Sequence, residues 1–235
     1  IPNTLERQFE VIPGEQNNWE IGGDYETFFS NGDRFKILFI ANQDNRDTVR
    51  ERFDVADDGS LTKNLFLDSG SVTEERIVRG SYTMDIFEGQ DIEFGAERAQ
   101  TTLASNLALG TDGTGTPSAD FGGLVPVDVS NANSTVEEIR YEPFIIHNWI
   151  FNPRMSLEST LLYEFSEITQ SGDVSNKRDF DFIKPKLDFR YDLTSTLQLR
   201  ALIEKQVRQL SFGDFVGGHF LFNSVSKYTR ILTFI

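Results

Sequence analysis

The chain has 235 residues, with 22 Lys and Arg against 37 Asp and Glu, a formal charge of −15, two histidines and no cysteine. The missing cysteines exclude disulfides, thiolate zinc sites, iron–sulfur clusters and thiol nucleophiles, and the acidic balance argues against nucleic acid as a partner. The 21 phenylalanines argue against a disordered acidic chain, which should be poor in aromatic residues.

A membrane-spanning helix is excluded by the apolar runs. The longest, Ile37–Ala41, falls far short of the ~20 residues that such a helix needs. Ile1–Glu20 carries charges throughout, so no signal peptide is expected in it. Transmembrane β-strands remain open, because their alternating pattern leaves mean hydropathy low.

The first predicted hairpin covers Trp19–Phe29 and Arg34–Ala41, which alternate between an apolar and a polar face. Asn31-Gly32 between them is a strong hairpin-turn signal, because both residues tolerate positive φ. An i, i+3, i+4 apolar stripe cannot be drawn through these segments, so a helical interpretation fails.

Three further hairpins follow the same pattern along the chain. The second joins Arg79–Phe87 to Asp91–Glu97 through Glu88–Gln90. The third joins Arg140–Phe151 to Met155–Thr169 through Asn152–Arg154. The fourth joins Phe180–Leu193 to Thr196–Leu210 across Thr194-Ser195. The sequence therefore predicts about eight long antiparallel strands.

The connections between hairpins are predicted to be long and polar. They cover residues 43–71, 109–134 and 171–179, which are rich in Gly, Asp, Asn, Ser or Thr. Short turns at one end and long loops at the other are the layout of outer-membrane barrels. A soluble antiparallel sandwich is the main alternative, because its strands alternate too. Strand arms of about 10–15 residues favour the membrane barrel over the sandwich, whose strands cluster near five or six.

Several segments resemble the barrel of TonB-dependent outer-membrane receptors of proteobacteria. They are Phe182–Tyr191, Leu197–Arg200, Gln209–Val216, Phe94–Glu97 and Met155–Gly172, and the resemblance covers roughly Trp19–Gly217. It implies a barrel of 22 strands filled by an N-terminal plug, which imports a scarce nutrient with energy delivered through TonB.

The chain departs from that plan, since it shows no plug, no TonB-contacting segment and only about eight strands. We therefore expect residues 1–218 to be a partial barrel and residues 219–235 to be an atypical tail, from a frameshift or truncation. Tyr228, Arg230, Leu232 and Phe234 alternate in that tail, so a small closed barrel is an alternative.

Each strand predicts one face toward lipid and one toward the lumen. The lipid-facing candidates are Ile21, Tyr25, Phe35, Ile37, Phe39, Leu157, Leu161, Tyr163, Leu187, Phe189, Tyr191 and Leu199. The lumen-facing candidates are Glu20, Asp24, Glu26, Glu93, Glu97, Glu158, Glu164, Asp188, Arg190, Arg200 and Glu204. Candidates for interfacial aromatic girdles are Trp19, Tyr25, Tyr82, Trp149, Tyr163 and Tyr191.

No catalytic, metal or cofactor site is predicted. His147 and His219 have no HxxxH or HxH partner, and Asp54–Gly59 lacks the ligand spacing of an EF-hand. Asp91, Glu93 and Glu97 share one strand face, which indicates a polar ladder and not a glycosidase pair.

The expected function is uptake of an iron chelate, cobalamin or saccharide across the outer membrane of a Gram-negative bacterium. The expected partners are membrane lipid, the nutrient, and the TonB complex through a plug that this chain does not contain; no cofactor and no enzymatic activity are expected. A soluble acidic β-module for binding or adhesion is the alternative.

Overall fold

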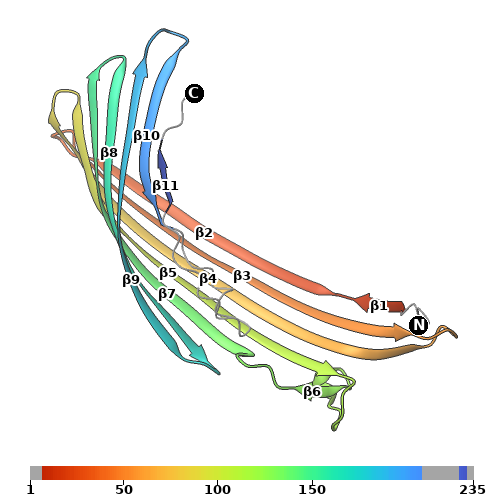
Figure 1. Cartoon of the computed structure of the whole chain (residues 1–235). Coiled ribbons are helices and arrows are strands. Elements are labelled where there is room, and N and C mark those ends of the chain that lie inside the picture. Colours follow the sequence, from red (N-terminus) through yellow and green to blue (C-terminus); the bar gives the residue numbers. More distant parts are fainter. Residues whose placement is uncertain (1–6, 208–227, 232–235) are drawn as a thin grey trace.

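The chain folds into one antiparallel, up-and-down β-sheet, a single curved layer (Figure 1). In this computed structural model the described residues are 7–207 and the backbone of 228–231. The strands are β1 Arg7–Val11, β2 Gly14–Phe28, β3 Arg34–Val55, β4 Leu61–Phe87, β5 Gln90–Thr111, β6 Val125–Val127, β7 Asn133–Asn152, β8 Met155–Gly172, β9 Asn176–Asp192, β10 Gln198–Gln206 and β11 Tyr228–Ile231. One short 3₁₀ helix, η1, spans Ala119–Phe121. No helix among these residues is long and apolar enough to span a membrane.

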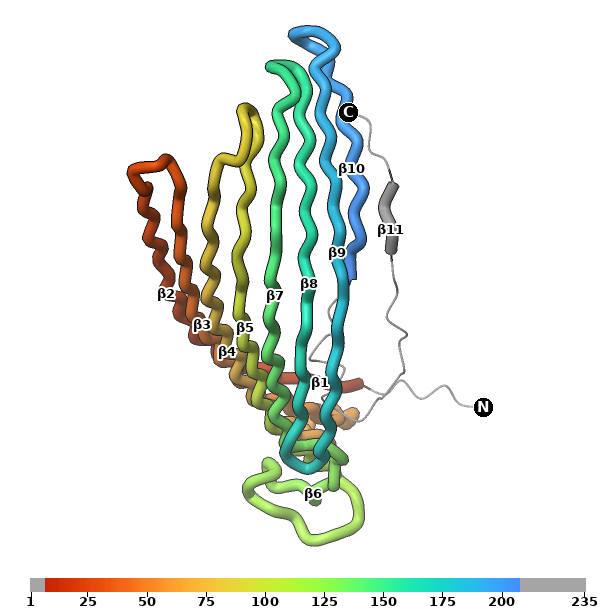
Figure 2. The backbone as a smooth tube through the Cα atoms, turned by 90° about the vertical axis from the view of Figure 1, so that its left-hand side faces the viewer, coloured from red at the N-terminus to blue at the C-terminus, as the bar shows by residue number. Residues whose placement is uncertain are grey.

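Neighbouring strands in the sheet follow the chain order. β1 and β2 both pair with β3. From β3 onward the order of paired strands is β3, β4, β5, β7, β8, β9, β10, β11. The pairings of the eight long strands are all antiparallel, so Figure 2 shows them running side by side from β2 to β10. Among the described residues no pairing joins β2 to β10, so the sheet has two edges.

The four predicted hairpins are confirmed. β2 and β3 meet across a turn in which the Gly32 backbone N–H donates to the Phe29 carbonyl at 3.0 Å, with Gly32 at φ 93°. Gly89, at φ 71°, lies in the β4–β5 turn. The fourth turn is longer than the predicted two residues, because β9 ends at Asp192, β10 begins at Gln198, and the Leu193 N–H bonds to the Leu197 carbonyl at 2.9 Å.

Two of the three predicted long loops are wrong. Residues 43–71 are mostly strand, since β3 continues to Val55 and β4 begins at Leu61, and residues 171–179 contain a connection of only three residues. Only 109–134 holds a long connection, which carries η1 and β6. The polar side chains of these extensions do not alternate with apolar ones, so the sequence pattern gives no strand signal there. Backbone hydrogen bonds to the neighbouring strands hold the extensions in the sheet.

The β3–β4 connection is a tight turn, Ala56–Ser60. The Ala56 N–H bonds to the Ser60 carbonyl at 3.0 Å, and Gly59 takes φ 83°. Hydrogen bonds from the side chain and backbone of Ser60 hold the pKa of Asp58 below its usual value. β4, which begins directly after this turn, has 27 residues and is therefore about 90 Å long at ~3.3 Å per residue.

The best-packed side chains lie on one face, which we call the concave face because the sheet curves toward it. Val136 is fully buried and lies with Ile168 in a small apolar cluster, against which Phe180 packs. Phe144, Glu138, Glu164 and Gln170 are also buried, and the strand pairings place all of them on this same face.

Candidate functional site

The strand register separates apolar from charged side chains across the whole sheet. Directly opposed residues of an antiparallel pair share a face. One row of such residues is Thr27, Phe35, Tyr82, Phe94, Ile145, Leu161 and Pro185. The neighbouring row is Glu26, Lys36, Ser81, Gly95, Phe144, Leu162 and Lys184. The first row belongs to the convex face and the second to the concave face.

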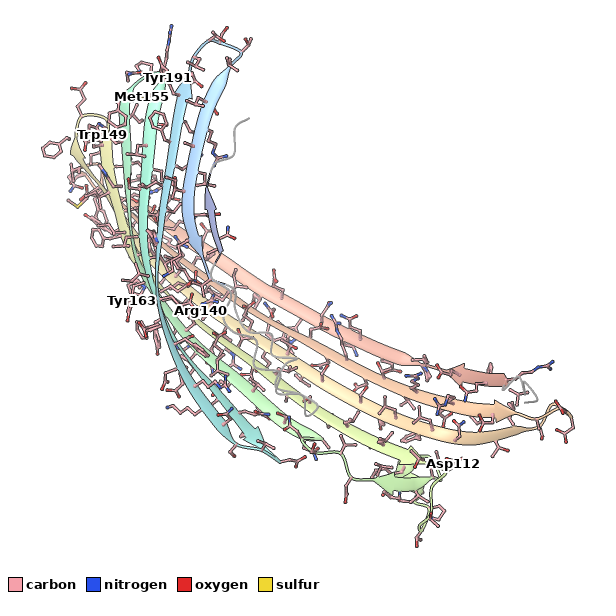
Figure 3. All side chains as sticks on the ribbon, viewed as in Figure 1. Asp112, Arg140, Trp149, Met155, Tyr163 and Tyr191 are labelled. Atoms are coloured by element: carbon pink, nitrogen blue, oxygen red, sulfur yellow. The ribbon has the colours of Figure 1, made fainter. Side chains whose placement is uncertain are left out.

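The strand register separates the two sets of face candidates from the sequence onto opposite faces of the sheet. The register places all twelve apolar candidates on the convex face and all eleven charged candidates on the concave face. In Figure 3, Tyr163 lies on the convex side of the bend and Arg140 on the concave side. This separation on the six strands that carry candidates follows from the pairing, because a slip of one residue would invert a strand.

The convex face exposes a continuous apolar surface. Ile21 is 58% exposed, Phe39 49%, Leu161 49% and Ile183 54%, and none of the described segments covers them. Monomeric soluble proteins rarely leave an apolar patch larger than a few hundred Å² open to water. The convex surface, which spans eight strands, is of the kind that such proteins rarely expose.

The apolar surface forms a band, which we call the convex band, beside the short hairpin turns. On β3 it spans Phe35–Ala41 and gives way to Gln43, Asn45 and Asp47 on the same face. On β8 it spans Met155–Phe165 and gives way to Glu167. Beyond this boundary polar side chains predominate on the convex face, while the concave face also holds the apolar cluster of Val136 and Ile168. The band therefore covers only one part of each strand.

The boundary of the convex band crosses the strands obliquely. On β2 the boundary lies at Trp19. The row of residues paired with Trp19 serves as the reference line, and it consists of Gln43, Glu74, Thr102, Glu137, Thr169 and, on β9, Lys177. On β10 the boundary lies at Ile203, which pairs with Leu187, ten residues beyond Lys177. The boundary does not shift evenly from strand to strand, since the apolar residue Ile139 on β7 lies beyond the straight line from Trp19 to Ile203.

This displacement gives the inclination of the strands. Ten residues along the strands at ~3.3 Å each equal about 33 Å, and seven steps between strands at ~4.8 Å also equal about 33 Å. The strands are inclined at about 45° to the normal of the band by this measure, and at about 30° by the boundary on β8, where Phe165 lies four residues from Thr169 after five steps.

The candidate girdle aromatics all lie on the convex face, although not all at the edges of the band. Trp19 and Tyr163 lie toward the polar extensions, and Tyr25, Trp149 and Tyr191 toward the turns. Tyr82 lies mid-band between Phe29 and Phe94, at ring-centroid distances of 5.8 and 5.7 Å. Its hydroxyl donates to Asp33.

A chain of ion pairs crosses the concave face from β4 to β9. Glu97 lies 3.9 Å from Arg79 and 3.5 Å from Arg140, which itself lies 3.6 Å from Glu142. The Lys184 Nζ lies 3.2 Å from Glu142 and also bonds Glu164. We call these six residues the charge ladder. It offsets the cost of placing charged groups on the packed side of the sheet.

A second charged group lies nearer the turns. Asp188, 2% exposed, accepts hydrogen bonds from Arg200, at 2.5 Å to Nη2 and 3.0 Å to Nε, and from Arg190 at 3.2 Å. Lys186 pairs with Glu158 at 2.8 Å. Both arginines were lumen-facing candidates, and the structure brings them together on one carboxylate.

A glycine on the concave face keeps the charge ladder close to the sheet. A Cβ on Gly95 would lie 2.2 Å from the Gly80 carbonyl oxygen and 2.7 Å from the Phe144 ring, over which the Arg79 guanidinium lies at 4.3 Å. We expect Gly95→Ala to lower the free energy of unfolding by about 1–3 kcal/mol through this overlap. Gly80→Ala, whose Cβ would meet nothing within 4 Å, is the matched control. Urea unfolding of both variants is the measurement, and equal midpoints would contradict the expectation.

The candidates for chemistry have structural roles. His147 Nε2 lies 3.0 Å from Gln90 Oε1, and Asp54–Gly59 runs through the end of β3 into its turn. Asp91 accepts a hydrogen bond from the Asn148 side chain at 2.8 Å, and the Glu93 carboxylate lies 4.0 Å from the Arg34 guanidinium. No group of three metal-ligating side chains occurs within the described residues, and His219 lies outside them.

The sequence interpretation did not single out Arg140, Glu142 or Lys184. Their even spacing within each strand indicates a shared face, but the ladder depends on which strands are neighbours and in which register. The segment Gln209–Val216 and most of the expected tail lie outside the described residues; of the tail only β11 is described, as a short strand paired with β10.

No family model matches the chain, and no curated protein matches it significantly.

Proposed function

We propose that this chain forms part of the wall of an outer-membrane β-barrel that imports a scarce nutrient. The oblique convex band is the observation that carries the proposal. Strands of transmembrane barrels are tilted by about 35–45° and present an apolar band about 25 Å tall to lipid. The inclination of about 30–45° derived from the register overlaps with that tilt.

The height of the convex band also suits a bilayer. On β8 it runs from Met155 to Phe165, about 33 Å along a strand at ~3.3 Å per residue. An inclination of about 30–45° projects this length to about 23–29 Å along the membrane normal, close to the ~25 Å of known barrels. The charged concave face would line a hydrated lumen, where lipid does not force the charges to be neutral.

The two edges of the sheet support a larger barrel. Lipid offers no hydrogen bonds to the unpaired backbone groups of β2 and of the part of β10 that β11 does not pair, so further strands must close the wall. Together with the resemblance of segments such as Phe182–Tyr191 to TonB-dependent receptors, this favours active uptake of an iron chelate, cobalamin or saccharide.

Two measurements on the full-length protein test this proposal. Cell fractionation should place the protein in the outer membrane, where it resists extraction by alkaline carbonate. Deletion of its gene should slow growth when one of the three nutrient classes is limiting, and loss of TonB should give the same defect. Recovery of the protein as a soluble species without detergent would instead favour the acidic β-module.

A further inference from the structure

A hollow of about 300 Å³ lies on the concave face, where the polar extensions of β3, β4 and β5 continue beyond the convex band. The side chains that line it on this face are Arg46, Thr48, Ser69, Ser71, Ser105 and Leu107. Asn131 and Ala132, which precede β7, complete its wall. We call it the hydroxyl hollow. Because it lies away from the short turns, the proposed location places it on the external side of the lumen, where a nutrient arrives.

The hydroxyl groups of the hollow retain hydrogen-bonding capacity. The Ser69 hydroxyl donates to the Thr48 carbonyl at 3.3 Å and the Ser105 hydroxyl to the Ser134 carbonyl at 3.4 Å, so both keep their acceptor lone pairs. The half-buried hydroxyls of Thr48 and Ser71 form no hydrogen bond within the described part of the chain. The hollow therefore offers donors and acceptors that groups of the protein do not satisfy.

The charge of the hollow is already balanced. Arg46 Nη2 lies 2.8 Å from the Asp44 carboxylate, and Arg46 Nε donates to the same carboxylate at 2.9 Å. An anionic ligand would have to compete with Asp44 for this guanidinium. Uncharged hydroxyl groups, in contrast, can accept hydrogen bonds from its remaining N–H groups while the ion pair stays intact.

Buried amides hold the loop wall of the hollow in place. Asn131 is 5% exposed and takes φ 65°, and Gln170 of β8 is 2% exposed. Gln170 Nε2 donates to Asn131 Oδ1 and to Ser134 Oγ, both at 3.2 Å. Because these contacts fix the loop wall within the chain itself, a ligand does not have to order it.

We propose that the hydroxyl hollow binds one sugar ring of an uncharged saccharide. The inference rests on the proposed nutrient uptake and selects one of its three nutrient classes. Sugar hydroxyls donate and accept hydrogen bonds as the side chains of the hollow do, and Leu107 contacts the C–H groups of the ring. An anionic iron chelate would need an unpaired cation, whereas Arg46 is paired. A volume of about 300 Å³ is at the lower end of ligand pockets, so it suits one sugar ring better than the corrin macrocycle of cobalamin.

The test is isothermal titration of the full-length protein, purified in detergent, with uncharged hexasaccharides of α-glucan, β-glucan, mannan and xylan. At least one of them should bind, whereas ferric citrate and cyanocobalamin should not. Thr48→Val and Ser71→Ala should each weaken saccharide binding about three- to ten-fold, the effect of one neutral hydrogen bond.

Thr160→Val and Ser81→Ala are the matched controls, because both replace half-buried hydroxyl residues of the concave face nearer the turns. They should leave the affinity unchanged. If no hexasaccharide binds, or if the controls weaken binding equally, the hollow is not a saccharide site, while the membrane location and the uptake stand on their own measurements. If a saccharide binds at the hollow but deletion of the gene causes no growth defect on it, import fails and the binding site stands.

Discussion

Leu161→Arg is expected to destabilise the membrane-inserted protein by about 2–4 kcal/mol, the cost of a lipid-facing arginine near the bilayer midplane. Leu161 lies in the middle of the convex band on β8 and is 49% exposed, with Ile145 and Pro185 as its neighbours on the adjacent strands. Since no described segment packs over it, the penalty arises from lipid and not from protein packing. The free energy of unfolding in lipid vesicles, from urea titration, is the measurement.

The control for Leu161→Arg is Asn45→Arg on the same convex face of β3. Asn45 lies beyond the band, among polar residues, and accepts a hydrogen bond from Gln43 at 2.8 Å. We expect it to change the free energy of unfolding by less than about 1 kcal/mol. Equal losses for the two variants would show that the convex band does not face lipid.

Lys184→Met is expected to cost about 2–4 kcal/mol, because it leaves Glu142 and Glu164 side by side without their shared cation. The Glu164 side chain is only 9% exposed, so water cannot replace the lysine well. Adding Glu164→Gln to Lys184→Met should recover part of this loss, since the second substitution removes the uncompensated charge. Urea unfolding of the single and double variants measures both effects.

Lys177→Met on the same strand is the matched control. Lys177 pairs with Glu167 on β8, as Lys184 pairs with Glu164, but its side chain is 57% exposed and that of Glu167 is 45% exposed. Exposed pairs of this kind contribute about 0–1 kcal/mol. If Lys177→Met and Lys184→Met cost the same, the charge ladder does not depend on its position on the packed face.

The sequence alone was sufficient to predict the hairpins and to predict which residues of a strand share a face. Alternation with period two fixes which residues share a side, and Asn31-Gly32 and Glu88-Gly89 mark turns where a residue takes positive φ. The apolar and the charged candidates, from Ile21 to Glu204, therefore fall on opposite faces of the sheet. These features are local, so no knowledge of distant partners was needed.

Only the tertiary structure determined the lengths of the strands, the register between them and what the register brings together. Arg46–Val55 and Leu61–Ser71 read as loops because their polar side chains give no apolar alternation, yet backbone pairing makes them strand. The charge ladder joins residues of five strands, and the inclination of the convex band depends on every pairing from β2 to β10. Such features depend on hydrogen bonds between residues far apart in the chain, for which a single sequence carries no periodic signal.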